Sequence, residues 1–191
     1  MSRLHYDTYE EIKIQVTNLF EQYYIRSLPI DCVKLAKDMG FELKPYSKLS
    51  AKKLKALKEL SGGDGYTIDN IDSGKKILFY DDSVCIGRQR FTILHEIGHY
   101  VLGHKEESEL AKSEADFFAK YAIAPVPIIY ALDIDNYVDI SEKFLTSSEC
   151  AFYIMDSYIK WLQYGPEYFT EYEKKLLTLF NIGDSKYNLL S

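Results

Sequence analysis

Hydrophobic residues recur at helical spacing along most of this chain of 191 residues, and they alternate with polar residues only in short runs. This pattern predicts helices at residues 7–24, 29–39, 50–60, 88–102, 108–123, 126–132, 140–145, 147–162 and 166–180. Extended segments are expected at 41–45, 66–71 and 76–80. The chain is therefore expected to be an α+β protein that is mostly helical and has one small antiparallel sheet.

The extended segments 66–71 and 76–80 are joined by Asp72, Ser73, Gly74 and Lys75, a composition that favours a hairpin turn. The second of these strands comes just before the helix predicted at 88–102. Its free edge can pair with an extended peptide and hold it over that helix. The alternative is an ordinary edge strand that is protected by charged neighbours. Both interpretations stay open, because edge exposure cannot be judged from the pattern alone.

The helix at 88–102 contains the motif H-E-x-x-H, formed by His95, Glu96 and His99. Residues four apart lie on one face of a helix, so the two imidazoles can direct nitrogen atoms to a single point. Glu96 is rotated about 100° from His95, which places its carboxylate beside that point. Two neutral nitrogen ligands with a neighbouring carboxylate are what a hydrolytic zinc site requires. We therefore predict a metal site with half-buried histidines, against the alternative of two incidental histidines and a surface glutamate.

A catalytic zinc usually takes three protein ligands. Four glutamates follow the motif closely: Glu106, Glu107, Glu109 and Glu114. Glu114 falls on the apolar stripe of the helix at 108–123, between Leu110 and Phe118, and a buried carboxylate needs a partner. Glu109 lies on a face that is expected to be solvated, together with Lys112, Ser113 and Asp116. Glu114 is therefore the predicted third ligand, and the alternative is an edge glutamate whose head reaches water.

His104 is a further histidine near the motif, but its spacing does not match a known three-histidine pattern. In metzincins a third histidine follows the second by six residues and a glycine follows it by three, whereas here the gaps from His99 to His104 and Gly103 are five and four. His104 is therefore expected to interact with the C-terminal carbonyls of its helix, or to support a metal ligand from behind.

Charge and composition narrow the class of protein further. A net charge of −6 argues against direct binding to nucleic acid or to an anionic membrane. The beginning of the chain, MSRLHYDTYEEIK, lacks the apolar region of a secretory signal, and no apolar run is long enough to span a membrane. Three cysteines, Cys32, Cys85 and Cys150, are far apart and are expected to be reduced thiols. These features favour a cytoplasmic protein.

Two segments of the chain resemble the ImmA/IrrE family of metallopeptidases. The first is R-x-R-F-T-I-x-H-E-I-G-H, which begins at Arg88, and the second is S-E-A-D-F-F-A from Ser113 to Ala119, followed by Pro125. The resemblance covers roughly residues 28–125. It implies a zincin-like domain, with His95, His99 and Glu114 as zinc ligands and Glu96 as general base. The C-terminal third resembles no family in particular.

The resemblance also implies a function and a division of the chain. Residues 1–127 are expected to form the metallopeptidase domain, and residues 128–191 a helical extension packed on it. The implied activity is zinc-dependent cleavage of a helix-turn-helix transcriptional repressor at one site, which relieves repression. One alternative is a regulator that binds a repressor or antitoxin without cleaving it and keeps a metal site. Another is a hydrolase of small amides or of peptides with little sequence preference.

Overall fold

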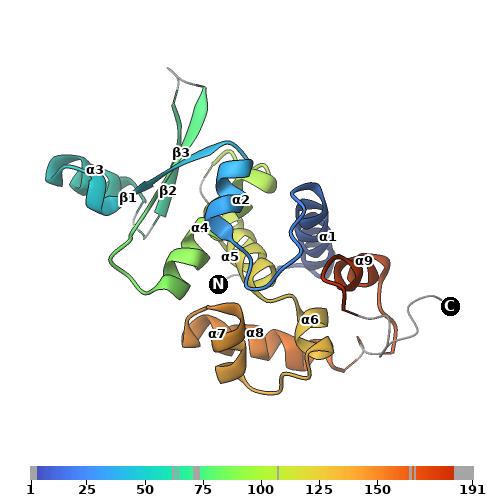
Figure 1. Ribbon diagram of the computed structural model, residues 1–191. Helices are drawn as coiled ribbons and strands as arrows, with labels where there is room; N and C mark the ends of the chain where they lie inside the picture. The colour runs from blue at the N-terminus through green and yellow to red at the C-terminus, as the bar shows by residue number, and fades with distance from the viewer. Residues whose placement is uncertain are drawn as a thin grey trace.

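Two adjacent helices, α4 (Ile86–Val101) and α5 (Glu109–Ile123), occupy the middle of the computed structural model, which describes residues 4–61, 63, 65–70, 74–106, 108–163, 165 and 167–182. A small sheet with the helix α3 (Ala51–Ser61) lies on one side of this pair, and α1 (Tyr6–Gln22) with α9 (Glu171–Leu179) lies on the other (Figure 1). The other helices are α2 (Cys32–Asp38), α6 (Val126–Ala131), α7 (Tyr137–Phe144) and α8 (Ser148–Trp161). The mostly helical α+β class expected from the sequence is confirmed.

The sheet contains the three predicted strands, but its pairing is mixed. Strand β3 (Lys75–Tyr80) is central, between β1 (Phe41–Pro45) and β2 (Gly65–Asn70). β2 pairs with β3 antiparallel, as the predicted hairpin requires, whereas β1 pairs with β3 in parallel. The expectation of a purely antiparallel sheet was therefore wrong. The reason is that α3 and β2 lie between β1 and β3 in the chain, so β1 reaches its partner by a crossover instead of a tight turn.

This strand order also corrects the prediction about the free edge. The strand just before α4 is β3, and both of its edges are paired. Among the described strands, β1 and β2 each have one unpaired edge, and of these two strands only β2 lines the space beside His95 and His99. A peptide that pairs with the sheet beside α4 would therefore pair with β2.

Local capping explains where several helices begin. Asp31 accepts a hydrogen bond from the backbone N–H of Lys34 at 2.8 Å and starts α2. α9 begins at Glu171, five residues later than the pattern suggested, because Thr170 and Glu173 form a reciprocal capping box. Some predicted features lie outside the described residues. They are the end of the predicted strand at residue 71, the first two residues of the predicted turn (Asp72 and Ser73), Glu107, the predicted helix start at Pro166 and the chain beyond residue 182.

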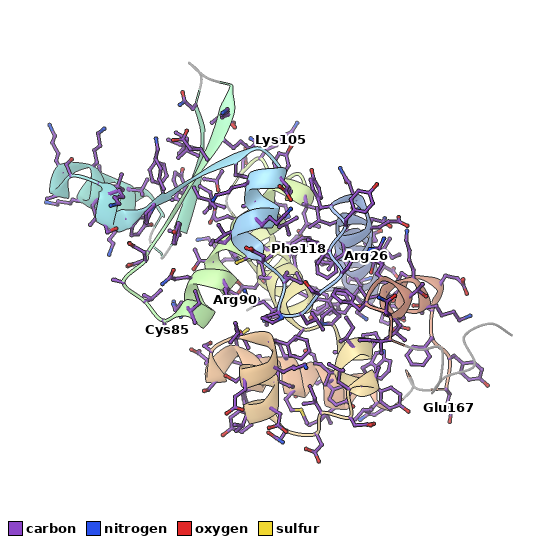
Figure 2. The ribbon with its side chains drawn as sticks, viewed as in Figure 1. Arg26, Cys85, Arg90, Lys105, Phe118 and Glu167 are labelled. Carbon is purple, nitrogen blue, oxygen red and sulfur yellow. The ribbon has the colours of Figure 1, made fainter. Side chains whose placement is uncertain are left out.

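The close contact between α4 and α5 depends on Gly98. A Cβ atom at this position would lie 3.0 Å from the ring of Phe118, which is fully buried on α5. Glycine at this position thus makes room for the ring of Phe118, which is labelled in Figure 2. The contact sets the distance between the histidine-bearing helix and the helix that carries Glu114.

One hydrophobic core extends through both parts of the chain. It joins Leu94 and Ile97 of α4 to residues as late as Leu176 and Phe180. The predicted boundary between residues 127 and 128 falls inside α6. The two parts share this core. Their separate roles, as a metallopeptidase domain and as an extension packed on it, therefore stay a prediction. Among the described residues, no helix is both long enough and apolar enough to cross a membrane.

Candidate metal centre

A cleft of about 740 Å³ runs between the sheet and the pair α4–α5. His95, Glu96 and His99 line it from α4, and Gly65, Tyr66, Thr67, Ile68 and Asp69 line it from β2. A larger cavity of about 1140 Å³ lies elsewhere, between α1, α5 and α8, and it contains none of these three residues. The chemistry of the lining residues, and not the size of the cavity, makes the smaller cleft the candidate active site.

The two histidines of the motif direct the same type of nitrogen atom to one point. His95 Nε2 and His99 Nε2 lie 3.0 Å apart, and both side chains are half-buried, as predicted. An ion held at zinc–nitrogen distances of about 2.0–2.1 Å can contact both atoms at this separation. The histidine pair therefore fits a divalent metal ion.

The other ring nitrogen of His95 lies near a carboxylate of α5, whereas that of His99 lies near His104, which in turn contacts a carboxylate of α5. Asp116 Oδ1 lies 2.9 Å from His95 Nδ1, although the two atoms are not aligned for a hydrogen bond. His99 Nδ1 lies 2.9 Å from His104 Nδ1, and His104 Nε2 lies 2.7 Å from Glu114 Oε2. Carboxylates in this position hold a ligating imidazole in its orientation and tautomer.

The contact that the structure shows for the Glu114 carboxylate is with His104. The Glu114 side chain is only 20% exposed, and a mostly buried carboxylate was expected to need a partner. That partner is His104. No group of three or more metal-binding side chains is preassembled within the described ranges. The structure brings His95 and His99 together, and the role of Glu114 as third ligand stays a prediction.

Glu96 lies in the same cleft, close to the beginning of β2. A Cβ atom on Gly65 would lie 3.5 Å from Glu96 Cγ and 2.3 Å from Thr92 Cγ2. Glycine at this position thus allows the first residue of β2 to approach α4 at the level of Glu96. The carboxylate of the motif and the open strand edge border the same space.

Burial and nearby rings keep His99 neutral. Desolvation, followed by the charges of His95 and His104, lowers the pKa of His99 to about 4. A metal ligand must present an unprotonated nitrogen atom. At neutral pH the His99 ring is therefore already in the form that binds a metal ion.

The low pKa of His99 predicts acid sensitivity of the metal-free protein. In the unfolded chain this ring takes up a proton near pH 6.5, whereas in the folded chain it does so only near pH 4. The contribution of His99 to stability is thus complete above pH 6.5 and is lost as the pH falls towards 4. Urea denaturation between pH 7 and pH 4 should show a smaller loss of stability for His99→Asn than for wild type. His5→Asn changes an exposed histidine and should behave as wild type; equal losses in all three proteins would contradict the assignment.

Asp116 was not identified from the sequence, where it was expected on a solvated face. His104 was expected to interact with the carbonyls at the end of its helix or to support a metal ligand, and the structure places its Nδ1 atom at His99 Nδ1. On α5 the buried face is rotated from the predicted stripe, so that Leu110 is 54% exposed and Ser113 only 7%. The rotation turns Asp116 towards His95. One indication in the sequence that Asp116 belongs to the site was its position in the E-A-D segment, two residues after Glu114.

Comparison with known protein families matches residues 50–132 to the peptidase family described as the IrrE N-terminal-like domain. The matched segment extends from just before α3 to the end of α6 and includes His95, Glu96, His99 and Glu114. Among curated proteins, no match to the chain was found.

Proposed function

Because this chain belongs, through residues 50–132, to the ImmA/IrrE metallopeptidase family, we propose that it is a zinc-dependent endopeptidase. The observation that carries the proposal is the pair of facing Nε2 atoms on His95 and His99, 3.0 Å apart in a cleft that also contains Glu96. Zinc ligands on consecutive turns of one helix, with a glutamate between them, are typical of metal-dependent hydrolysis of amides.

His95 and His99 would hold the zinc ion through Nε2, with Glu114 as the proposed third protein ligand. A bound zinc ion supplies Lewis-acid chemistry, which polarises a carbonyl and makes water acidic enough to react at neutral pH. Asp116 and His104 act behind the ligands. Their contacts with the two Nδ1 atoms orient the imidazoles, and this support strengthens ligand binding.

Glu96 is the proposed general base and acid. Its carboxylate accepts a proton from the attacking water and then gives that proton to the leaving amine nitrogen. This role explains why the motif contains a glutamate that is not needed to hold the metal. It also requires the scissile bond to lie in the cleft, next to Glu96.

The open edge of β2 is the proposed seat of the substrate backbone. β2 lines the cleft along Gly65 to Asp69, and its antiparallel partner β3 occupies only its other edge. An extended peptide that adds to this edge gains backbone hydrogen bonds and runs along the cleft past the histidines. The geometry favours a polypeptide substrate over a small amide, because a small amide would leave the strand edge unused.

The proposed substrate is a helix-turn-helix transcriptional repressor in the cytoplasm. This choice follows from the resemblance to the family, and the chain's own charge agrees with it in one respect. With a net charge of −6, the protein is suited to act on a DNA-binding protein without binding DNA itself.

Metal content tests the proposal. Purified wild-type protein should contain one zinc ion per chain, and His99→Ala should lose it. Glu114→Ala should also lose zinc if this carboxylate is the third ligand, whereas Glu109→Ala, an exposed residue on the same helix, should retain it. Retention in Glu114→Ala would instead assign Glu114 to the support of His104. Wild-type protein that takes up no zinc even on reconstitution would overturn the peptidase proposal.

A further inference from the structure

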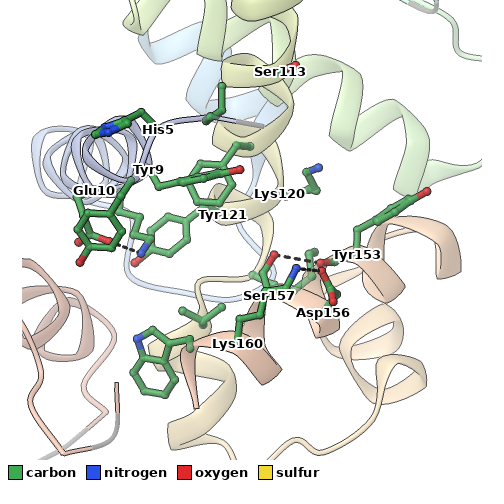
Figure 3. Close-up of a pocket in the computed structure, with 18 residues that line it drawn as sticks. His5, Tyr9, Glu10, Ser113, Lys120, Tyr121, Tyr153, Asp156, Ser157 and Lys160 are labelled. Atoms are coloured by element: carbon green, nitrogen blue, oxygen red, sulfur yellow. Dashed lines mark hydrogen bonds and ion pairs between the residues drawn. The ribbon is translucent and has the colours of Figure 1, made fainter. Parts of the chain in front are cut away.

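Helix α8 has an apolar side that is wider than the part of it that packs on the core. The residues that pack on the core are Cys150, Ala151, Ile154, Tyr158 and Trp161. A second side lines the cavity between α1, α5 and α8, where Figure 3 shows Tyr153, Asp156, Ser157 and Lys160. The remaining side faces solvent, and it is apolar as well.

The solvent-facing side of α8 carries a regular apolar stripe, which we call the α8 stripe. Its members are Phe152, Met155, Ile159 and Leu162. They are separated by three, four and three residues, which is the spacing of the a and d positions in paired helices. Phe152 is 60% exposed, Ile159 51% and Leu162 39%. A helix that only covers a core carries polar residues on this side, so the stripe calls for a partner.

Tyr137 of α7 extends the stripe onto a second helix. Its ring contacts that of Phe152, with centroids 6.2 Å apart, and its side chain is 43% exposed. α7 and α8 lie together at the lower edge of the molecule in Figure 1. Taking about 200 Å² for each large side chain, these exposed fractions amount to roughly 400 Å² of apolar surface. Patches of this size on single chains are often binding surfaces.

A second copy of the chain fits this surface by size. In an interface of standard size each partner buries about 800 Å², and a little more than half of that area is apolar. The apolar patch supplies about that share. Exposed polar side chains beside the stripe, such as Asp156 and Lys160, can supply the polar rim.

The α8 stripe is also complementary to itself. Its positions are symmetric about residue 157, so an antiparallel pair of α8 helices sets Phe152 of one copy opposite Leu162 of the other. The same arrangement sets Met155 opposite Ile159. Each layer then joins two different side chains, and every contact occurs twice, as a two-fold axis requires.

The charges beside the stripe favour the same arrangement. Asp156 and Lys160 form an ion pair within α8 and lie on the flank between the stripe and the side that lines the cavity. In the antiparallel pair, Lys160 of one copy comes within about one helical turn of Asp156 of the other. A parallel pair would instead place Asp156 beside Asp156 and Lys160 beside Lys160, where like charges repel.

We propose that the α8 stripe and Tyr137 form the interface between two copies of this chain, with the two α8 helices antiparallel. The cleft that contains His95 and His99 is a separate surface, because none of the described residues of α7 and α8 lines it. The proposal therefore does not depend on peptidase activity.

Sedimentation velocity over a concentration series tests the proposal. Wild type should have the mass of two chains at high concentration and dissociate on dilution. Phe152→Ser and Ile159→Ser should each raise the dissociation constant of the dimer at least about tenfold, since the two-fold axis removes each contact twice. Leu110→Ser is the matched control, because Leu110 is an exposed leucine on α5. It should dimerise as wild type does.

A charge exchange tests the pairing between copies. Asp156→Lys and Lys160→Asp should each weaken the dimer, because like charges then face each other across the interface. An equimolar mixture of the two variants should associate again, which the loss of an ion pair within one helix cannot explain.

Three results would overturn the proposal. The first is a wild type that stays a single chain at the highest soluble concentration, in which case the patch would face a different protein. The second is a dimer that Phe152→Ser and Leu110→Ser weaken equally or not at all. The third is a mixture of the charge variants that associates no better than each variant alone.

Discussion

Glu96→Gln is expected to cleave peptides at least about 10³-fold more slowly than wild type while binding zinc equally well. A general base or acid contributes roughly 10²–10⁴-fold to such a reaction, and Glu96 is proposed to act as both. Glutamine keeps the size and shape of the side chain, but it cannot take up a proton. The measurement is kcat/KM on a library of fluorogenic peptides, with zinc content determined on the same preparations.

Glu109→Gln is the matched control, since it makes the same chemical change at an exposed position of α5. Its activity should equal that of wild type. If Glu96→Gln cleaves as fast as wild type, Glu96 is not the base. If Glu96→Gln stops cleavage but still relieves repression fully in cells, the protein acts by binding its repressor, and the regulator alternative gains.

Arg90→Met is expected to lower the free energy of unfolding by about 2–4 kcal/mol. Arg90, labelled on α4 in Figure 2, is only 7% exposed. Its Nη1 atom donates to the carbonyl oxygen of Ile30 at 2.8 Å, and Nη2 donates to that of Phe144 at 3.4 Å. The guanidinium thereby connects α4 to the segment before α2 and to the end of α7. Methionine can fill part of the space, but it leaves two buried carbonyl groups without these donors.

Urea denaturation of the metal-free protein measures this loss as a lower midpoint at an unchanged slope. Arg88→Met is the control, because Arg88 lies two residues earlier on the same helix and is exposed. The control should change stability by less than about 0.5 kcal/mol. An equal midpoint for the two variants would show that Arg90 does not connect these segments.

Features that depend on neighbours in the chain were predictable from the sequence. The motif of His95, Glu96 and His99 needed only the period of a helix, and the hairpin needed only a turn between two apolar runs. The cap at Asp31 is equally local. These features need no knowledge of how one element packs on another.

The features that were missed depend on packing between elements distant in the chain. Whether Asp116 meets solvent or His95 is decided by the rotation of α5 about its own axis, and the buried Phe118 against Gly98 fixes that rotation. His104 meets Glu114 only because the turn after α4 folds back to α5. β1 joins β3 in parallel for a similar reason, since its partner lies more than thirty residues further along the chain.

The continuous core has a consequence for how this protein can be divided. Ile140, Phe144, Ile154 and Leu176 follow the end of the family match, yet each is at most 2% exposed and belongs to the same cluster as Ile97 and Phe118. A chain ended at residue 132 would leave the apolar surface beneath them uncovered. The segment that matches the family model is therefore shorter than the segment that is needed to fold into a stable structure. A truncated gene product would be a target for degradation even with every residue of the metal centre intact.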